Sequence, residues 1–207
     1  MKKALRKFGL LLMISLLLCY HNYAQPSFVS IVVDSVSCNG LSDGKITVNI
    51  TGGTKPYIYI LTCLIPPQSA SSGLTNDTFY TFSSLPASNY YEITVIDDNG
   101  SGDPVKYPGY IRVRQPSKLV VNISANPSSF CQGIDVQLNG NPAGGNGYYT
   151  HEWSGTGAAY LNFTNIVNPI FNGSVLGSYN LKYKAVDIKG CADSAELPLT
   201  VYALPTV

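Results

Sequence analysis

The chain has 207 residues, a formal net charge of +1 and only 12% charged residues, about half the share that is usual in soluble domains. Serine, threonine, asparagine and 15 tyrosines carry the polarity instead. Without the N-terminal segment 1–24 the chain has 9 basic and 12 acidic residues, which argues against a nucleic-acid partner, since such a surface needs a concentrated basic patch. The composition is typical of exposed faces of extracellular β-structure.

The first 24 residues predict a secretory signal peptide. Four basic residues, Lys2, Lys3, Arg6 and Lys7, precede an apolar run of 12 residues, Phe8 to Cys19, which is too short to span a bilayer as a helix. We expect cleavage after Ala24; lipidation of Cys19 is the alternative, disfavoured by the bulky residue before it. The mature chain then has 9 basic and 12 acidic residues and no further membrane segment. We expect a secreted or outer-surface protein.

After the signal, apolar and polar residues alternate with the period of two that favours β-strands. In 179–187, Tyr179, Leu181 and Tyr183 share one face, expected in a core, while Lys182 and Lys184 share the other. No helical period is present. We predict strands at 46–50, 57–61, 91–97, 110–113, 119–123, 136–138, 179–187 and 197–203. The predicted fold class is all-β, with pairs of packed antiparallel sheets.

The second half of the mature chain repeats landmarks of the first. SCNG at Cys38 and FCQG at Cys131 lie 93 residues apart, and the turns at Asp97 and Asp187 lie 90 residues apart. Two domains of similar size follow from this spacing, joined by a short proline-containing junction that limits their swing. The predicted division is 1–24 signal peptide, 25–117 first domain and 118–207 second domain.

Three phrases in the first half fall in a recognisable order: C-N-G-L-S-D-G from Cys38, G-G-T-K-P-Y from Gly52 and Y-E-I-T-V-I-D from Tyr91. Together they resemble the SprB repeat, named for a surface adhesin of gliding Bacteroidetes-type bacteria, over nearly all of 28–116. One departure is Ser101, which stands where the SprB pattern usually has a cysteine.

The second half carries C-Q-G at Cys131, Trp153 on an early strand, and G-S-Y-N-L-K-Y-K-A-V-D-I-K-G-C from Gly177 to Cys191. It resembles the PKD-like repeat of the same kind of surface protein. Both families are Ig-like β-sandwiches. The resemblance therefore implies two tandem Ig-like antiparallel β-sandwich domains after the signal peptide, and a role in adhesion or gliding.

Four cysteines remain after the signal, and an even count in an exported chain favours disulfides. A metal site is disfavoured because no C-x-x-C pair exists. The resemblance implies that Cys131 bonds to Cys191. In the first half, where Ser101 replaces the family's second cysteine, it leaves Cys63 as the partner of Cys38. Two free thiols, or a bridge between the halves, are the alternatives.

The residues give no sign of a catalytic site. His151 is the only histidine of the mature chain. It alternates with Tyr149 and Trp153, so we interpret it as a partly buried ring of the sandwich and not as a base or metal ligand. No G-x-S-x-G motif exists, and the three glutamates are not paired as a glycosidase requires. We expect no enzyme activity and no cofactor.

One segment is a weak metal candidate. Asp97, Asn99, Ser101 and Asp103 alternate like the first half of a calcium loop, but the twelfth position is proline instead of glutamate. A hairpin turn built on Asn99 and the following glycine is the simpler interpretation.

Two further features concern the surface. Ser35 and Ser194 lie in Asp-Ser-apolar triplets, which the resemblance implies as O-glycosylation sites. Adjacent tyrosines such as Tyr90–Tyr91 and Tyr148–Tyr149 must each place one ring outward, as a cross-strand packing partner or as a platform for sugars.

Two functional hypotheses follow. The first is a non-catalytic extracellular adhesin-type module that serves as spacer and binding surface in cell-surface adhesion or gliding. The alternative is a carbohydrate-binding module of a secreted polysaccharide-acting system. In both, the expected partner is a cell-surface or extracellular glycan or protein, and not a nucleic acid.

Overall fold

The computed structural model describes residues 24–97 and 102–205. The predicted signal peptide, apart from Ala24, lies outside the described residues. Within these ranges the only helical element is a single 3-10 turn, η2 (Ala158–Tyr160), and all the other elements are β-strands. The all-β prediction is confirmed.

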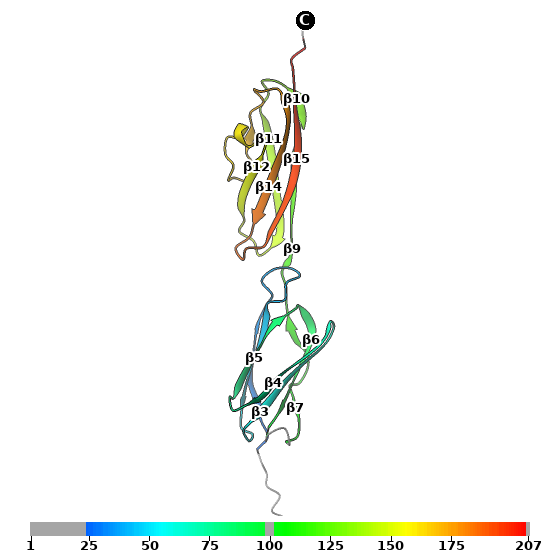
Figure 1. Cartoon of the computed structure of the whole chain (residues 1–207), viewed down its shortest axis with the longest axis vertical. Coiled ribbons are helices and arrows are strands. Elements are labelled where there is room, and N and C mark those ends of the chain that lie inside the picture. Colours follow the sequence, from blue (N-terminus) through cyan, green and yellow to red (C-terminus); the bar gives the residue numbers. More distant parts are fainter. Residues whose placement is uncertain (1–23, 98–101, 206–207) are drawn as a thin grey trace, which may run out of the picture. The chain divides into compact units, whose positions relative to one another are not determined.

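The first half of the described chain forms two sheets (Figure 1). The first has the order β1-β2-β5 and comprises β1 (Ser27–Asp34), β2 (Gly44–Thr51) and β5 (Phe79–Leu85). The second has the order β4-β3-β6-β7, with β8 also paired to β6. Its strands are β3 (Tyr57–Leu64), β4 (Pro67–Thr75), β6 (Ser88–Ile96), β7 (Val105–Lys106) and β8 (Ile111–Val113).

The second half forms two more sheets, with the orders β13-β11-β9 and β10-β15-β14-β12. All the pairs that these strands make are antiparallel except β10 with β15, which run parallel. The strands are β9 (Ser117–Ala125), β10 (Ser129–Cys131), β11 (Val136–Gly145), β12 (Thr150–Gly155), β13 (Ile170–Phe171), β14 (Gly177–Val186) and β15 (Ala192–Tyr202). Because β10 is parallel to β15, Cys131 lies opposite Tyr202, at the end of β15.

Strand β14 shows how the sequence pattern becomes burial. Tyr179, Leu181, Tyr183 and Ala185 are buried, while the residues between them are exposed. The strand pairs with β15 in unbroken register, from Gly177 opposite Val201 to Val186 opposite Ala192. Burying each large apolar side chain contributes about 1.5–3 kcal/mol, so the alternation fixes which face of the strand turns inward.

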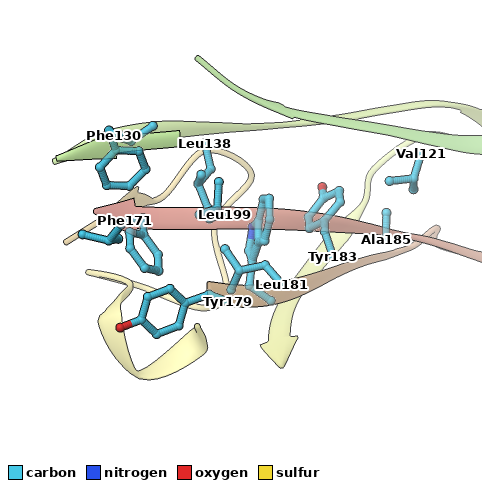
Figure 2. Close-up of a cluster of buried hydrophobic side chains, with 12 residues drawn as sticks. Val121, Phe130, Leu138, Phe171, Tyr179, Leu181, Tyr183, Ala185 and Leu199 are labelled. Carbon is cyan, nitrogen blue, oxygen red and sulfur yellow. The ribbon is translucent and has the colours of Figure 1, made fainter. Parts of the chain in front are cut away.

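Aromatic rings fill much of the core of the second half (Figure 2). Phe171 lies 5.2 Å from Tyr179 and 6.1 Å from Phe130 between ring centroids, in edge-to-face arrangements. Trp153 lies 4.7 Å from Tyr183, and its indole N–H donates to the carbonyl of Ile166 at 3.0 Å. In Figure 2, Phe130, Phe171 and Tyr179 gather at one end of the cluster, and Val121 and Ala185 lie at the other.

The first half buries the alternate residues of β2, β3 and β6. These are Ile46, Val48, Ile50, Tyr57, Tyr59, Leu61, Cys63, Tyr91, Ile93 and Val95. The buried tyrosines keep their hydroxyl groups hydrogen-bonded: Tyr59 donates to the carbonyl of Asp77 at 2.9 Å, and Tyr91 accepts from Gln68 at 2.6 Å. Burial raises the pKa of Tyr91 to about 12.

By its internal contacts the chain divides into two compact units. One comprises the residues up to Val32, Thr47–Thr81 and Tyr90–Ile111; the other comprises Val33–Ile46, Phe82–Asn89 and Arg112–Val207. The second unit therefore contains both Cys38 and Cys191. The domain boundary expected between residues 117 and 118 stays a prediction.

Candidate functional site

The most distinctive element of the described chain is a disulfide between Cys38 and Cys191. Their Cα atoms lie 5.6 Å apart, and 153 residues separate them in sequence. Cys38 lies between β1 and β2, and Cys191 lies between β14 and β15. The bond therefore closes a loop that contains every strand from β2 to β14.

The predicted bond between Cys131 and Cys191 is wrong. Cys131 ends β10 and lies opposite Tyr202, whereas Cys191 directly precedes the first residue of β15. The 11 residues of β15 extend over about 35 Å at the usual rise of a strand. Disulfide-bonded Cα atoms lie less than about 7 Å apart, so the two cysteines at opposite ends of this strand cannot bond. Cys131 is a free, half-buried thiol.

The predicted bond between Cys38 and Cys63 is also wrong, because Cys38 is bonded to Cys191. Cys63 is a buried residue of β3, opposite Gln68 on one side and Tyr91 on the other. Its thiol donates to the carbonyl of Ile65 at 3.4 Å. The bridge between the two sequence halves, left open as an alternative, is the one that the structure contains.

A turn that follows β14 positions Cys191. The carboxylate of Asp187 accepts hydrogen bonds from the backbone N–H groups of Lys189 at 2.8 Å and Cys191 at 3.0 Å. Its other oxygen accepts from the backbone N–H and the side-chain amide of Asn146, at 2.7 and 2.8 Å. Burial raises the pKa of Asp187, but these donors outweigh it and hold the pKa below its ordinary value. The charged carboxylate therefore fixes the turn.

The amide of Asn146 connects this turn to the loop that carries Cys38. Besides Asp187, it donates to the carbonyl of Ser37 at 3.0 Å. The sulfur of Cys191 lies 3.4 Å from the same carbonyl oxygen. Asn146 thus contacts both sides of the disulfide, a role that was not predicted from the sequence. The matching triplets G-G-T before Pro56 and G-G-N before Tyr148 were the signal that could have found it.

The loop around Cys38 is built from its own hydrogen bonds. The carbonyl of Cys38 accepts from the backbone N–H of Leu41 at 3.1 Å, and Gly40 between them has φ +82°. The N–H of Ser37 donates to the carboxylate of Asp43 at 2.9 Å. Hydrogen bonds from Ser37 lower the pKa of Asp43. The cysteine therefore lies in a defined turn and not in a loose loop.

In the first half, Asp97 makes a contact of the same type with a Gly-Gly segment. The carboxylate of Asp97 accepts from the backbone N–H of Thr54 at 2.7 Å, as Asp187 accepts from Asn146. A glycine precedes each donor, with φ +74° at Gly53 and +60° at Gly145. A Cβ atom would lie 2.9 Å from the Asp97 carboxylate at Gly53 and 2.6 Å from the Asp187 carboxylate at Gly145. Close approach of the carboxylate therefore requires both glycines.

These contacts bear on the weak calcium candidate. Asp97 is buried and Asp103 is exposed, while Asn99 and Ser101 lie outside the described residues. Among the residues that the structure describes, no three His, Cys, Asp or Glu side chains gather as a metal site. The described side-chain contact of Asp97 is the hydrogen bond that its carboxylate accepts from the backbone N–H of Thr54.

The remaining predicted residues fall on strands. His151 is half-buried on β12; its Nδ1 lies 2.7 Å from the Tyr183 hydroxyl oxygen, and burial lowers its pKa. Trp153, the next inward residue of β12, is buried. Ser35 and Ser194, the predicted O-glycosylation sites, are both exposed; modification at these sites stays a prediction.

A shallow polar groove lies between the segments 87–89 and 112–115, with a volume of about 460 Å³. Arg112 and Arg114, two residues apart at the end of β8, are exposed and line it. The groove presents two positive charges next to the amide side chains of Asn89 and Gln115. It is suited to an anionic or strongly hydrogen-bonding ligand.

Comparisons with known proteins give one family match. A family model described as the SprB repeat matches residues 30–62, so the predicted resemblance is confirmed for this segment. It stays a prediction for the rest of the first half, as does the PKD-like resemblance of the second. No curated protein matches the chain.

Among solved structures, the chain is similar to three N-terminal domains of the outer capsid protein Hoc of bacteriophage RB49 (17% identity, TM-score 0.47, covering 84% of this chain and 59% of that one). It is also similar to the C-terminal fragment of intimin, solved with the intimin-binding domain of its receptor Tir (13%, 0.41, 84% and 64%). A third is a set of fibronectin(III)-like modules of Clostridium thermocellum CbhA (12%, 0.33, 84% and 95%). The chain spans less than two thirds of the first two structures.

In the described ranges, no helix has the length and apolar character that crossing a bilayer requires.

Proposed function

We propose that the chain is a non-catalytic extracellular adhesin-type module, a load-bearing spacer and binding surface in cell-surface adhesion or gliding. The observation that carries the proposal is the disulfide between Cys38 and Cys191, which are 153 residues apart. The SprB-repeat match of residues 30–62 supports a surface role.

The disulfide changes how a pulling force travels along the chain. Tension applied between residue 24 and residue 205 would pass from the N-terminal segment through Cys38, across the sulfur bridge to Cys191, and out along β15. The strands from β2 to β14 lie inside the closed loop and outside this covalent path. An anchored spacer that must stay folded under shear benefits from this arrangement.

Single-molecule stretching of the full chain tests this role. With the disulfide intact, the segment from Cys38 to Cys191 cannot extend. After reduction, about 500 Å of additional contour length should be released, since 153 residues extend by about 3.3–3.6 Å each.

The matched control is Cys131→Ser, which leaves the bond intact and should keep the length hidden. If oxidised and reduced chains release the same length, the load-bearing role is contradicted.

Export belongs to the same proposal. The chain is proposed to begin at Gln25 after signal cleavage and to reside outside the cell. N-terminal sequencing of the secreted or surface-labelled protein should therefore read Gln-Pro-Ser-Phe. A mature protein that begins at Met1 and is protected from labelling on intact cells would contradict this part.

The second candidate function, carbohydrate binding, is favoured by the groove next to Arg112 and Arg114. Two guanidinium groups are suited to the carboxylates or sulfates of acidic sugars. Glycan-array binding that favours acidic glycans and falls at least tenfold in Arg112→Ala/Arg114→Ala would support it. Loss of binding in Tyr148→Ala instead, at a ring that is 88% exposed, would indicate an aromatic platform.

A further inference from the structure

A second groove lies beside the turn η2, the short coil in Figure 1, and takes no part in the proposed load-bearing role. We propose that this groove binds one ring of a neutral hexose sugar. Its volume is about 430 Å³, within the range of ligand pockets, about 300–1,000 Å³. The inference goes beyond the proposed function, because the groove contains neither the disulfide nor the two arginines of the other groove.

The segment that follows η2 lies antiparallel to β13. The backbone N–H of Asn162 donates to the carbonyl of Ile170 at 3.0 Å, and that of Asn172 donates to the carbonyl of Tyr160 at 2.8 Å. All four residues line the groove. The backbone bonds therefore hold the two asparagines in place on neighbouring segments.

Strand β11 brings Asp135 to the other side of β13. In this pair Val136 lies opposite Phe171, so the register continued by one residue places Asp135 opposite Asn172. Val136 and Phe171 are buried, whereas Asp135 and Asn172 are exposed. Since successive side chains alternate between the two faces, Asp135 and Asn172 share the outer face.

The hydrogen bonds of the two asparagines fix the orientation of their amide groups. Oδ1 of Asn162 accepts from two backbone N–H groups, at 2.9 and 2.8 Å. Oδ1 of Asn172 accepts from a third, at 3.0 Å. A backbone N–H can only donate, so the oxygen of each amide faces the backbone. Both side-chain NH₂ groups are left as donors for a ligand, beside the exposed carboxylate of Asp135 as an acceptor.

An aromatic ring completes the groove. The ring of Tyr160 is half-buried, with its centroid 5.1 Å from that of Tyr179 and 5.9 Å from that of Phe171. These two core rings hold Tyr160 in place, and Ile170 beside it is 39% exposed. The groove thus combines an apolar surface with a few fixed polar groups, as ligand sites do.

This set of groups matches a neutral sugar. Each sugar hydroxyl both donates and accepts, so neighbouring hydroxyls can accept from an amide NH₂ and donate to the Asp135 carboxylate. The apolar C–H face of the ring can pack on Tyr160 and Ile170. Among the described residues that line the groove, Asp135 is the only charged one. Its negative charge disfavours the carboxylated and sulfated sugars that two arginines would favour.

Saturation-transfer NMR of the full mature chain with the methyl glycosides of glucose, galactose and mannose tests the proposal. We expect transfer to the ring protons of at least one of them, with a Kd of about 1 mM, a usual value for a ligand of this size. Asn162→Asp keeps the oxygen that the backbone needs and removes the NH₂ donor, and Asp135→Asn removes the carboxylate. Each variant should weaken binding by about tenfold, the value of one lost hydrogen bond. The matched control is Asn139→Asp, the same change at an exposed position of β11 outside the groove, and it should leave binding unchanged.

Absence of transfer to all three glycosides at several times this concentration would overturn the proposal. So would transfer that Asn162→Asp and Asp135→Asn leave at full strength. If a variant fails to fold, the unchanged chain still decides: the bound sugar should shift the backbone amide signals of 159–162 and 170–172, and shifts confined to 87–89 and 112–115 would contradict the proposal. Failure here is distinct from failure of the load-bearing role, because the stretching result depends only on the bond between Cys38 and Cys191.

Discussion

Asp97 and Asp187 occupy corresponding places in the sequence of the two halves, and they differ in the residue that stands four positions later, Ser101 in the first half and Cys191 in the second. Both carboxylates accept from the residue after a Gly-Gly pair, at 2.7 Å in each case. Only the Asp187 turn carries a cysteine, and that cysteine bonds to Cys38. In both halves, therefore, a carboxylate packs against a Gly-Gly segment. The cysteine is a separate feature of the second half, and it links the Asp187 turn covalently to the loop of Cys38.

The greatest loss of stability should follow from replacing Cys191. Cys191→Ser opens a loop of 153 residues, worth about 5 kcal/mol of unfolding free energy in the chain-entropy treatment. Denaturant unfolding of the oxidised chain should show most of this loss, and Cys131→Ser should change stability by less than about 1 kcal/mol. Equal stability of Cys191→Ser and the unchanged chain would mean that the bond does not constrain the unfolded state.

A smaller loss of stability is expected when the glycine next to either carboxylate is replaced, Gly145 beside Asp187 or Gly53 beside Asp97. Gly145→Ala forces a Cβ against the Asp187 carboxylate in addition to an unfavourable φ, and should cost about 2–3 kcal/mol. Gly53→Ala should cost nearly as much. The control is Gly190→Ala, where φ is +86° but a Cβ meets nothing within 4 Å, so only about 1 kcal/mol is expected. If the three variants are equally stable, carboxylate contact is not the reason for the glycines.

The charge of Asp187 should give a smaller, pH-dependent effect. Its pKa is lowered in the folded chain, so its contribution to stability is complete above the ordinary pKa of about 3.9. That contribution is lost as the pH falls through the lower folded value. Asp187→Asn should therefore destabilise the chain at pH 7 and flatten the decline of stability in acid, measured by urea unfolding between neutral and acidic pH. An unchanged acid slope would contradict the role of this carboxylate.

The smallest effect is expected at an ion pair that neither turn uses. Lys106 and Glu92 lie 3.6 Å apart with 65% and 32% of their side chains exposed. Such a pair contributes about 0–1 kcal/mol, so Glu92→Gln should leave the denaturation midpoint almost unchanged. If Glu92→Gln lost as much stability as Gly145→Ala, the surface ion pair would contribute as much to the free energy of unfolding as the glycine contacts do.

Alternation of apolar residues predicted the strands that bury one face. The runs 46–50, 57–61, 91–97 and 179–187 lie on strands that alternate between buried and less buried residues, except that the last residue of each of the latter two runs, Asp97 and Asp187, lies just past its strand. Strand β4 was missed because most of its residues are exposed on both faces, so PQSASSGLT has no apolar alternation to detect. Strand β1 was also missed, because most of its residues are exposed.

The disulfide could not be predicted from the sequence, because pairing depends on which ends of the strands meet. The family resemblance implied a bond between Cys131 and Cys191, but these two cysteines lie beside opposite ends of β15. The sequence does contain the relevant signals: the two C-x-G phrases are alike, and the position after Asp97 that matches Cys191 is Ser101. Only the backbone geometry shows that the two kinds of cysteine belong to different kinds of turn.

The most direct test of the account is a disulfide map of the oxidised chain, with thiols blocked before digestion. We expect one cross-linked pair within the chain, joining the peptide with Cys38 to the peptide with Cys191. A Cys131–Cys191 pair or a Cys38–Cys63 pair in its place would show that each half closes on itself, and would contradict the bond on which the load-bearing role depends.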